Sequence, residues 1–142
     1  MKKIILIYLF LLSFSGFAQK INDNIRVTEV LDTLNYLKTF EVNKSKYIGK
    51  PFSVLLADMK KIQPKTVWPQ HGRYKTSIVG NRFKFADMDF SFDNTIILSV
   101  KWSESIPYEN FKYYTNRNGF YFTQEERTYL GSKIVKDIMV YR

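Results

Sequence analysis

The stretch that decides the fold is residues 83–102, which read FKFADMDFSFDNTIILSVKW. Its second half is apolar at every other position from Ile96 to Trp102, a period that is typical of a strand with one face in the core. In its first half the apolar positions change parity near Ala86. We therefore predict two antiparallel strands, the first carrying a β-bulge at residues 86–87, joined by a hairpin turn at residues 93–94.

The chain just before this stretch predicts a further strand. Apolar and polar residues alternate from Tyr74 to Val79, and the pair Gly80-Asn81 that follows is typical of a turn. Residues 64–73 contain two prolines and a glycine, so we expect a loop there.

Downstream of residue 102 the sequence favours a short helix and a last strand. Residues 107–122 admit either a helix after Pro107 or a hairpin around Asn118-Gly119. Thr123 and Glu126 have capping-box spacing, which predicts a short helix ending at Gly131. Residues 134–141 are apolar on both faces and predict a final strand that is either interior to the sheet or covered on both sides.

Two amphipathic segments precede the strands. Residues 25–39 and residues 51–62 carry apolar side chains at offsets of three and four, and Pro51 suits a first helical position. Helices followed by strands are typical of an α+β domain. We expect two N-terminal helices packed on one face of a mostly antiparallel sheet of four to five strands.

The first 18 residues have the features of a cleavable signal peptide. Lysines at positions 2 and 3 precede an apolar run over residues 4–14, and small residues precede a cleavage site after Ala18. The apolar run is shorter than the roughly 20 residues that a spanning helix needs. We therefore predict one exported domain over residues 19–142, periplasmic or extracellular, with no transmembrane segment in the mature chain.

Positive charge is concentrated in the middle of the chain. Residues 38–84 contain eleven Lys and Arg against two acidic side chains, whereas residues 85–142 contain seven basic and eight acidic side chains. Such a basic block can attract anionic partners, or it can be a solvated face that aids solubility. Export argues against nucleic acid as the partner.

Catalytic and metal-binding motifs are missing from the sequence. The chain has no cysteine and a single histidine, His71, so thiol chemistry and sites built from soft metal ligands are excluded. The acidic run over residues 87–93 lacks the glycine and the final glutamate of a calcium loop. We therefore expect no cofactor and no metal, and an enzyme is the less favoured class.

Four glutamates nevertheless leave one enzymatic alternative open. Paired carboxylates at about 5 to 9 Å perform glycoside hydrolysis, and sequence alone does not place any two of these side chains together. The candidates are Glu104, Glu109, Glu125 and Glu126.

Aromatic side chains near cationic ones give the strongest binding signal. Rings can stack on sugars, and a neighbouring guanidinium can hold an anionic group. The same rings can instead fill the core. The candidate ligand-binding residues are Trp68, His71, Arg73, Tyr74, Tyr113 and Tyr114.

Together these features favour a non-enzymatic exported binding domain of the cell envelope. The expected partner is an envelope or secreted protein or an anionic glycan. The first alternative is a small secreted hydrolase that acts on cell-wall or glycan material with paired carboxylates. The second is adhesion to a membrane or polymer driven by the basic block alone.

Overall fold

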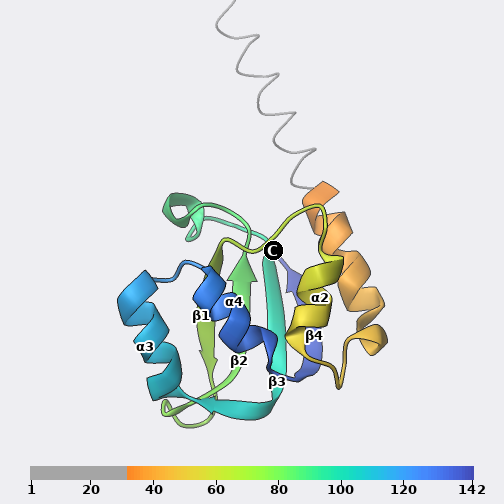
Figure 1. The fold of residues 1–142 in the computed structure, drawn as a ribbon. Helices are drawn as coiled ribbons and strands as arrows, with labels where there is room; N and C mark the ends of the chain where they lie inside the picture. The colour runs from red at the N-terminus through yellow and green to blue at the C-terminus, as the bar shows by residue number, and fades with distance from the viewer. Residues whose placement is uncertain (1–31) are drawn as a thin grey trace, which may run out of the picture. The chain divides into compact units, whose positions relative to one another are not determined.

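The computed structural model describes residues 32–142, and residues 33–142 form one compact unit. The predicted signal peptide and the start of the helix predicted at 25–39 lie outside the described residues. Figure 1 shows the order of the elements along the chain. They are a helix over residues 32–42, η1 (Lys44–Lys46), α2 (Phe52–Asp58), β1 (Thr66–His71), β2 (Ser77–Lys84), η2 (Met88–Phe90), β3 (Ile97–Pro107), α3 (Tyr108–Asn118), α4 (Gln124–Gly131) and β4 (Val135–Tyr141).

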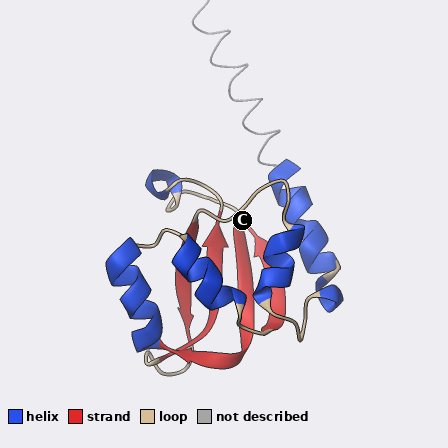
Figure 2. Cartoon of the chain, viewed as in Figure 1, coloured by secondary structure: helices blue, strands red, loops and turns tan. Residues whose placement is uncertain are grey.

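The four strands form one antiparallel sheet in the order β1-β2-β3-β4, so each strand pairs with its neighbour in sequence. Figure 2 shows α2 and α4 in front of this sheet. The predicted α+β class and the antiparallel sheet are confirmed.

One row of side chains across the sheet defines its core face. Val67, Phe83, Leu98 and Val140 are register partners on successive strands, and none is more than 2% exposed. Phe52 of α2 packs on this row, with its ring centroid 4.8 Å from that of Phe83. Large apolar side chains buried in this way supply most of the favourable free energy of folding.

Two of the predicted helices and one strand are observed, although α2 ends at Asp58 rather than at residue 62. α2 begins directly after Pro51, and α4 begins after Thr123 with the complete capping box to Glu126. The apolar positions of this alternation are buried as predicted: Ile96 directly precedes β3, and Leu98, Val100 and Trp102 lie in it. Between β3 and α4, the helical alternative after Pro107 is correct, because α3 spans Tyr108–Asn118.

The prediction of a loop at residues 64–73 was wrong, because β1 occupies Thr66–His71. Pro69 lacks an N–H, but β1 is the first strand of the sheet, where a proline is tolerated. Hydrogen-bonded pairing with residues distant in sequence outweighs the loop signal of the prolines and the glycine. β2 pairs along one side of β1, and on the other side the Val67 N–H donates to the Phe120 carbonyl over 2.8 Å.

The predicted turn at Gly80-Asn81 was also wrong, because β2 runs through both residues. The predicted β-bulge at residues 86–87 is not observed, because these residues lie beyond the end of β2. A bulge between Ile78 and Gly80 places Ile78, Asn81 and Phe83 all in the buried face. The turn lies earlier, over residues 73–76.

Of the strand predicted to begin at Phe83 and run to Phe92, only residues 83–84 are in a strand, and the hairpin turn predicted after it is not observed. β2 ends at Lys84, whose register partners Thr66 and Ile97 are themselves the end residues of β1 and β3. Residues beyond Lys84 therefore have no partner strand. Residues 88–90 form a 3₁₀ turn instead, and Phe92 is 78% exposed.

The last strand was placed correctly, but it is neither interior to the sheet nor covered on both sides. β4 spans Val135–Tyr141 at the edge of the sheet rather than in its interior. Its apolar residues on the second face are accordingly accessible, with Met139 40% and Tyr141 37% exposed.

We predict that Gly80→Ala destabilises the domain by about 1–3 kcal/mol, the usual cost of forcing extra atoms into a packed site. A Cβ at Gly80 would lie 2.6 Å from the Val100 carbonyl oxygen and 2.7 Å from Gln70 Oε1. The measurement is urea unfolding. Gly131→Ala is the matched control, because its Cβ would meet nothing closer than 3.6 Å. Equal stability of the two variants would contradict the prediction.

Asp58 gives a pH-dependent prediction. Its carboxylate accepts hydrogen bonds from Lys46 Nζ at 2.7 Å and Tyr47 Oη at 3.0 Å, and these bonds lower the pKa of Asp58. A depressed carboxyl pKa contributes stability above the unfolded-state value of 3.8, and this contribution is lost as the pH falls through the folded-state value.

We therefore expect Asp58→Asn to be less stable than the parent protein at pH 7, with the difference shrinking below about pH 3.8. Urea unfolding across pH measures this difference. Asp89→Asn is the control, because Asp89 has no ion pair among the described residues. A difference that stays constant with pH would refute the assignment.

Candidate functional site

A cavity of about 350 Å³ lies between β1 and α3, and we name it the β1–α3 pocket. Its walls come from two strands, one helix and the segment that follows that helix. The lining residues are Trp68, Pro69, His71, Arg82, Tyr108, Phe111, Thr115 and Phe120.

The aromatic wall of this pocket is held rigidly. The rings of Trp68 and Phe120 stack with centroids 3.9 Å apart and planes at 10°. The indole Nε1 donates to Thr66 Oγ1 over 3.2 Å, which fixes the ring orientation. Phe120 is also tied to β1 through its backbone carbonyl, so both rings are fixed relative to this strand.

His71 presents a hydrogen-bond acceptor near the mouth of the pocket. Its Nδ1 lies 3.1 Å from the Lys75 carbonyl oxygen, which only accepts, so Nδ1 carries the proton in the neutral ring. Nε2 is then left with its lone pair. The Tyr108 ring lies beside the imidazole, with centroids 5.1 Å apart.

Arg82 supplies positive charge to the same pocket. It is an exposed register partner of Trp68 on β2, and it has no ion pair among residues 32–142. Lys84, two residues further along β2, lies 5.0 Å above the Trp68 ring. Burial, and secondly the charge of Arg82, lower the pKa of Lys84. The aromatic wall therefore has cations beside it.

The structure brings only two of the six predicted residues into this pocket. Trp68 and His71 line it, whereas Arg73 and Tyr74 lie in the turn after β1, where Tyr74 is 68% exposed. Arg82 was missed as a site residue, because only the pairing of β1 with β2 places it opposite Trp68.

Tyr113 and Tyr114 lie in a second depression, between α3 and α4, which we name the tyrosine pocket. It has a volume of about 500 Å³. The Tyr114 ring contacts the rings of Tyr113 and Tyr129, with centroid distances of 5.2 and 5.0 Å. Burial is the main cause that raises the pKa of Tyr114. The lining residues are Tyr113, Tyr114, Gln124, Glu125, Thr128 and Tyr129.

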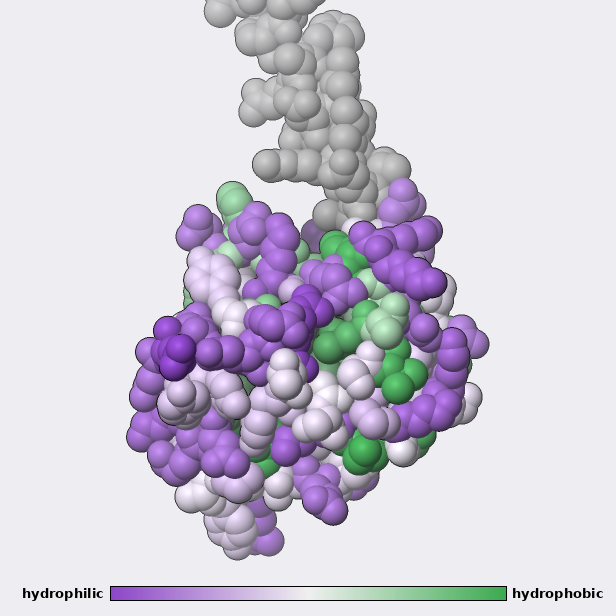
Figure 3. Space-filling view, in the orientation of Figure 1, coloured by the Kyte–Doolittle hydropathy of each residue, from purple (hydrophilic) through white to green (hydrophobic). Residues whose placement is uncertain are grey.

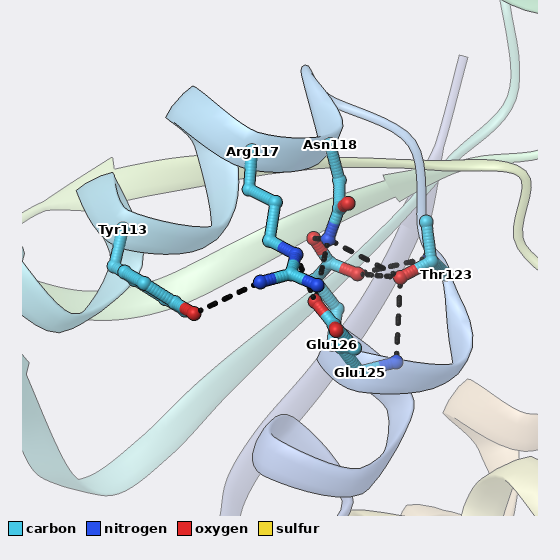
Figure 4. Close-up of polar contacts among 6 residues, drawn as sticks. All are labelled: Tyr113, Arg117, Asn118, Thr123, Glu125 and Glu126. Atoms are coloured by element: carbon cyan, nitrogen blue, oxygen red, sulfur yellow. Dashed lines mark hydrogen bonds and ion pairs between the residues drawn. The ribbon is translucent and has the colours of Figure 1, made fainter.

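A polar network beside the tyrosine pocket joins the end of α3 to the start of α4 (Figure 4). Asn118 Nδ2 lies 3.1 Å from Glu125 Oε2 and 3.0 Å from Glu126 Oε1. Arg117 pairs with Glu125 at 3.3 Å, and Glu126 also accepts from the Thr123 N–H and hydroxyl.

This network brings two of the candidate catalytic carboxylates, Glu125 and Glu126, close together, but hydrogen bonds already occupy Glu126. Glu126 is 2% exposed and both of its oxygens accept hydrogen bonds. A carboxylate engaged in this way serves as a helix cap. The hydrolase alternative stays a prediction, and the contacts of Glu126 do not favour it.

The described part of the chain offers no metal cage. No group of three or more His, Cys, Asp or Glu in residues 32–142 is arranged to hold an ion, and the acidic run over residues 87–93 is included in that range. No helix within the same residues has the length and apolar character needed to cross a membrane.

Comparisons with protein-family models, with curated protein sequences and with solved structures give no match. The class that the fold and the pockets define is an α+β domain with an antiparallel sheet of four strands and a preformed aromatic pocket at the first strand.

We predict that Thr123→Ala destabilises the domain by about 1 kcal/mol, the typical cost of removing an N-cap side chain. The Thr123 hydroxyl accepts from the Glu125 N–H and contacts buried Glu126. Thr128→Ala is the control, because its hydroxyl bonds only to the Gln124 carbonyl on the exposed side of the same helix. Thermal unfolding compares the two, and equal losses would contradict the capping role.

Proposed function

We propose that this protein is a non-enzymatic exported binding domain whose β1–α3 pocket accepts one sugar unit of an anionic glycan. One observation carries the proposal, namely that a stacked aromatic pair, a hydrogen-bond acceptor and a cation with no carboxylate partner in residues 32–142 line a single pocket. They are the Trp68–Phe120 pair, His71 Nε2 and Arg82.

Each of these groups has a counterpart on an acidic sugar. A sugar ring has an apolar face that packs on aromatic rings, and its hydroxyls donate to an imidazole nitrogen. Its carboxylate or sulfate pairs with a guanidinium in a charge-assisted hydrogen bond. A concave pocket of about 350 Å³ lies within the usual range for small-ligand sites.

The size of the pocket favours a glycan over a folded protein partner. Stable protein–protein interfaces bury roughly 800 Å² on each side, and their contact surfaces extend well beyond one pocket. A single sugar unit of a longer chain needs only a local, preformed site. The preformed rings reduce the side-chain entropy that is lost on binding.

Adhesion through the basic block alone is less well supported. Four of its lysines, Lys38, Lys44, Lys46 and Lys65, form ion pairs with Glu41, Asp137, Asp58 and Asp87. Exposed pairs are worth little in stability, but they reduce the free charge that the block offers to a polymer. Because these ion pairs neutralise part of the charge of the block, a localised site around Arg82 is favoured over adhesion through the whole block.

Export is part of the proposal and rests on the sequence. The lysines, apolar run and small residues over residues 1–18 would direct the chain out of the cytoplasm, with cleavage after Ala18. The mature domain, residues 19–142, would then meet glycans of the envelope or cell surface.

We expect Arg82→Gln to weaken binding of a glucuronate-containing oligosaccharide at least about tenfold, the loss of one hydrogen bond to a charged group. Titration of residues 19–142, followed by tryptophan fluorescence, measures this change. Arg73→Gln is the matched control, because Arg73 lies outside the pocket.

Binding should persist at about 0.2 M salt, because the contact is short-range and partly enclosed. Two results would count against the proposal. One is an equal loss in the Arg82→Gln and Arg73→Gln variants, and the other is an affinity that disappears at this salt concentration. Either result would favour adhesion through the basic block instead.

A further inference from the structure

A third depression, about 730 Å³ in volume, lies between α2 and α4, and we name it the α2–α4 groove. α2 contributes Ser53 and Leu56, α4 contributes Gln124 and Arg127, and Gln63 comes from the segment after α2. The surface that carries these two helices is mostly hydrophilic, with small apolar areas around α2 (Figure 3). The lining of the groove combines these polar side chains with apolar ones such as Leu56.

Arg127 is held in one orientation within this groove. Its Nη1 donates to Gln63 Oε1 over 2.7 Å, and its guanidinium carbon lies 4.8 Å from the centroid of the Phe122 ring. Gln63 is fixed in turn, because its Nε2 donates to the carbonyls of Leu56 and Met59. A cation stacked on an aromatic face and bonded to an anchored amide is preorganised.

The charge of Arg127 has no carboxylate partner among residues 32–142. The acids of the neighbouring elements are engaged elsewhere: Asp58 with Lys46, and Glu125 with Arg117. Glu126 accepts from Asn118 and Thr123. Burial lowers the pKa of Arg127, as expected for a guanidinium that has lost solvent without gaining an anion.

We propose that the α2–α4 groove binds a carboxylate, which the Arg127 guanidinium holds through its remaining N–H groups. The planar fork of a guanidinium matches the two oxygens of a carboxylate. Arg127 is the single cation among the lining residues, and one positive charge balances one carboxylate. A phosphate dianion would call for further cations or a row of backbone N–H groups.

The neighbouring pocket indicates what the carboxylate belongs to. Gln124 and Thr128 line both the α2–α4 groove and the tyrosine pocket, so the two depressions lie on either side of the same ridge of α4. A ligand held by Arg127 can therefore extend over this ridge toward the rings of Tyr113 and Tyr114. A ligand that has both a carboxylate and an apolar face able to pack on aromatic rings is a uronic acid in a sugar chain.

This second site rests on the proposed function for its class of ligand, but it does not need the β1–α3 pocket. The experiment uses the chain expressed from its full sequence and purified as the host cell processes it. D-glucuronate is titrated and followed by NMR of arginine side-chain N–H and backbone amide signals, with D-glucose as the uncharged comparison.

We expect saturable shifts at Arg127 and Thr128 with glucuronate and none with glucose. Arg127→Lys keeps the charge but removes the fork, and it should weaken this binding at least about tenfold. Gln124→Glu adds a carboxylate at the start of α4, where a negative charge favours the helix. This variant should also weaken binding while the domain stays folded, so loss of binding in both variants excludes misfolding as the cause.

Arg82→Gln should leave these shifts unchanged, which separates the two sites. If Arg82→Gln removed them and Arg127→Lys did not, the groove would be refuted and the β1–α3 pocket would remain. If Arg127→Lys alone removed them, the groove would stand even if the β1–α3 pocket bound no glycan. Equal binding of N-acetylglycylglycine and glucuronate would overturn the assignment to an acidic sugar.

Discussion

The packing of the Phe52 ring against the sheet is the contact on which the rest of the structure depends. Its centroid lies 4.8 Å from that of Phe83, 5.4 Å from Trp102 and 6.5 Å from Phe122. These neighbours belong to β2, β3 and the segment that leads into α4. One side chain therefore joins α2 both to the sheet and to the start of α4. Trp102 Nε1 donates to Asn81 Oδ1 over 2.9 Å, which satisfies the polar atoms buried beside the rings.

One of the two proposed sites, the α2–α4 groove, is a consequence of this arrangement. Phe52 and Phe122 hold α2 and α4 over the same face of the sheet (Figure 1). The α2–α4 groove lies between these two helices. The β1–α3 pocket instead depends on β1, which pairs with β2 on one side and with residues 120–122 on the other. That double pairing sets the Trp68 ring against Phe120 and opposite Arg82.

Local sequence patterns predicted secondary structure correctly where the strand or helix depends on residues close together in the sequence. The alternation from Ile96 to Trp102 and the capping box of Thr123 and Glu126 predicted β3 and the start of α4. The same reasoning failed for Phe92, because an alternating segment becomes a strand only when a partner is in register. Here the Lys84 ammonium donates to the Ser91 carbonyl and ties these residues into a loop.

The sequence by itself determined the α+β class, the antiparallel order, the absence of thiol chemistry and the aromatic and cationic residue types available for binding. These properties follow from composition and from periodicity within single segments. Only the tertiary structure decided which of those residues meet. Trp68 with Arg82, and Arg127 with Gln63, are far apart in sequence, and strand register and helix packing bring each pair together. Such contacts form through long-range pairing and shared burial, which no local pattern encodes.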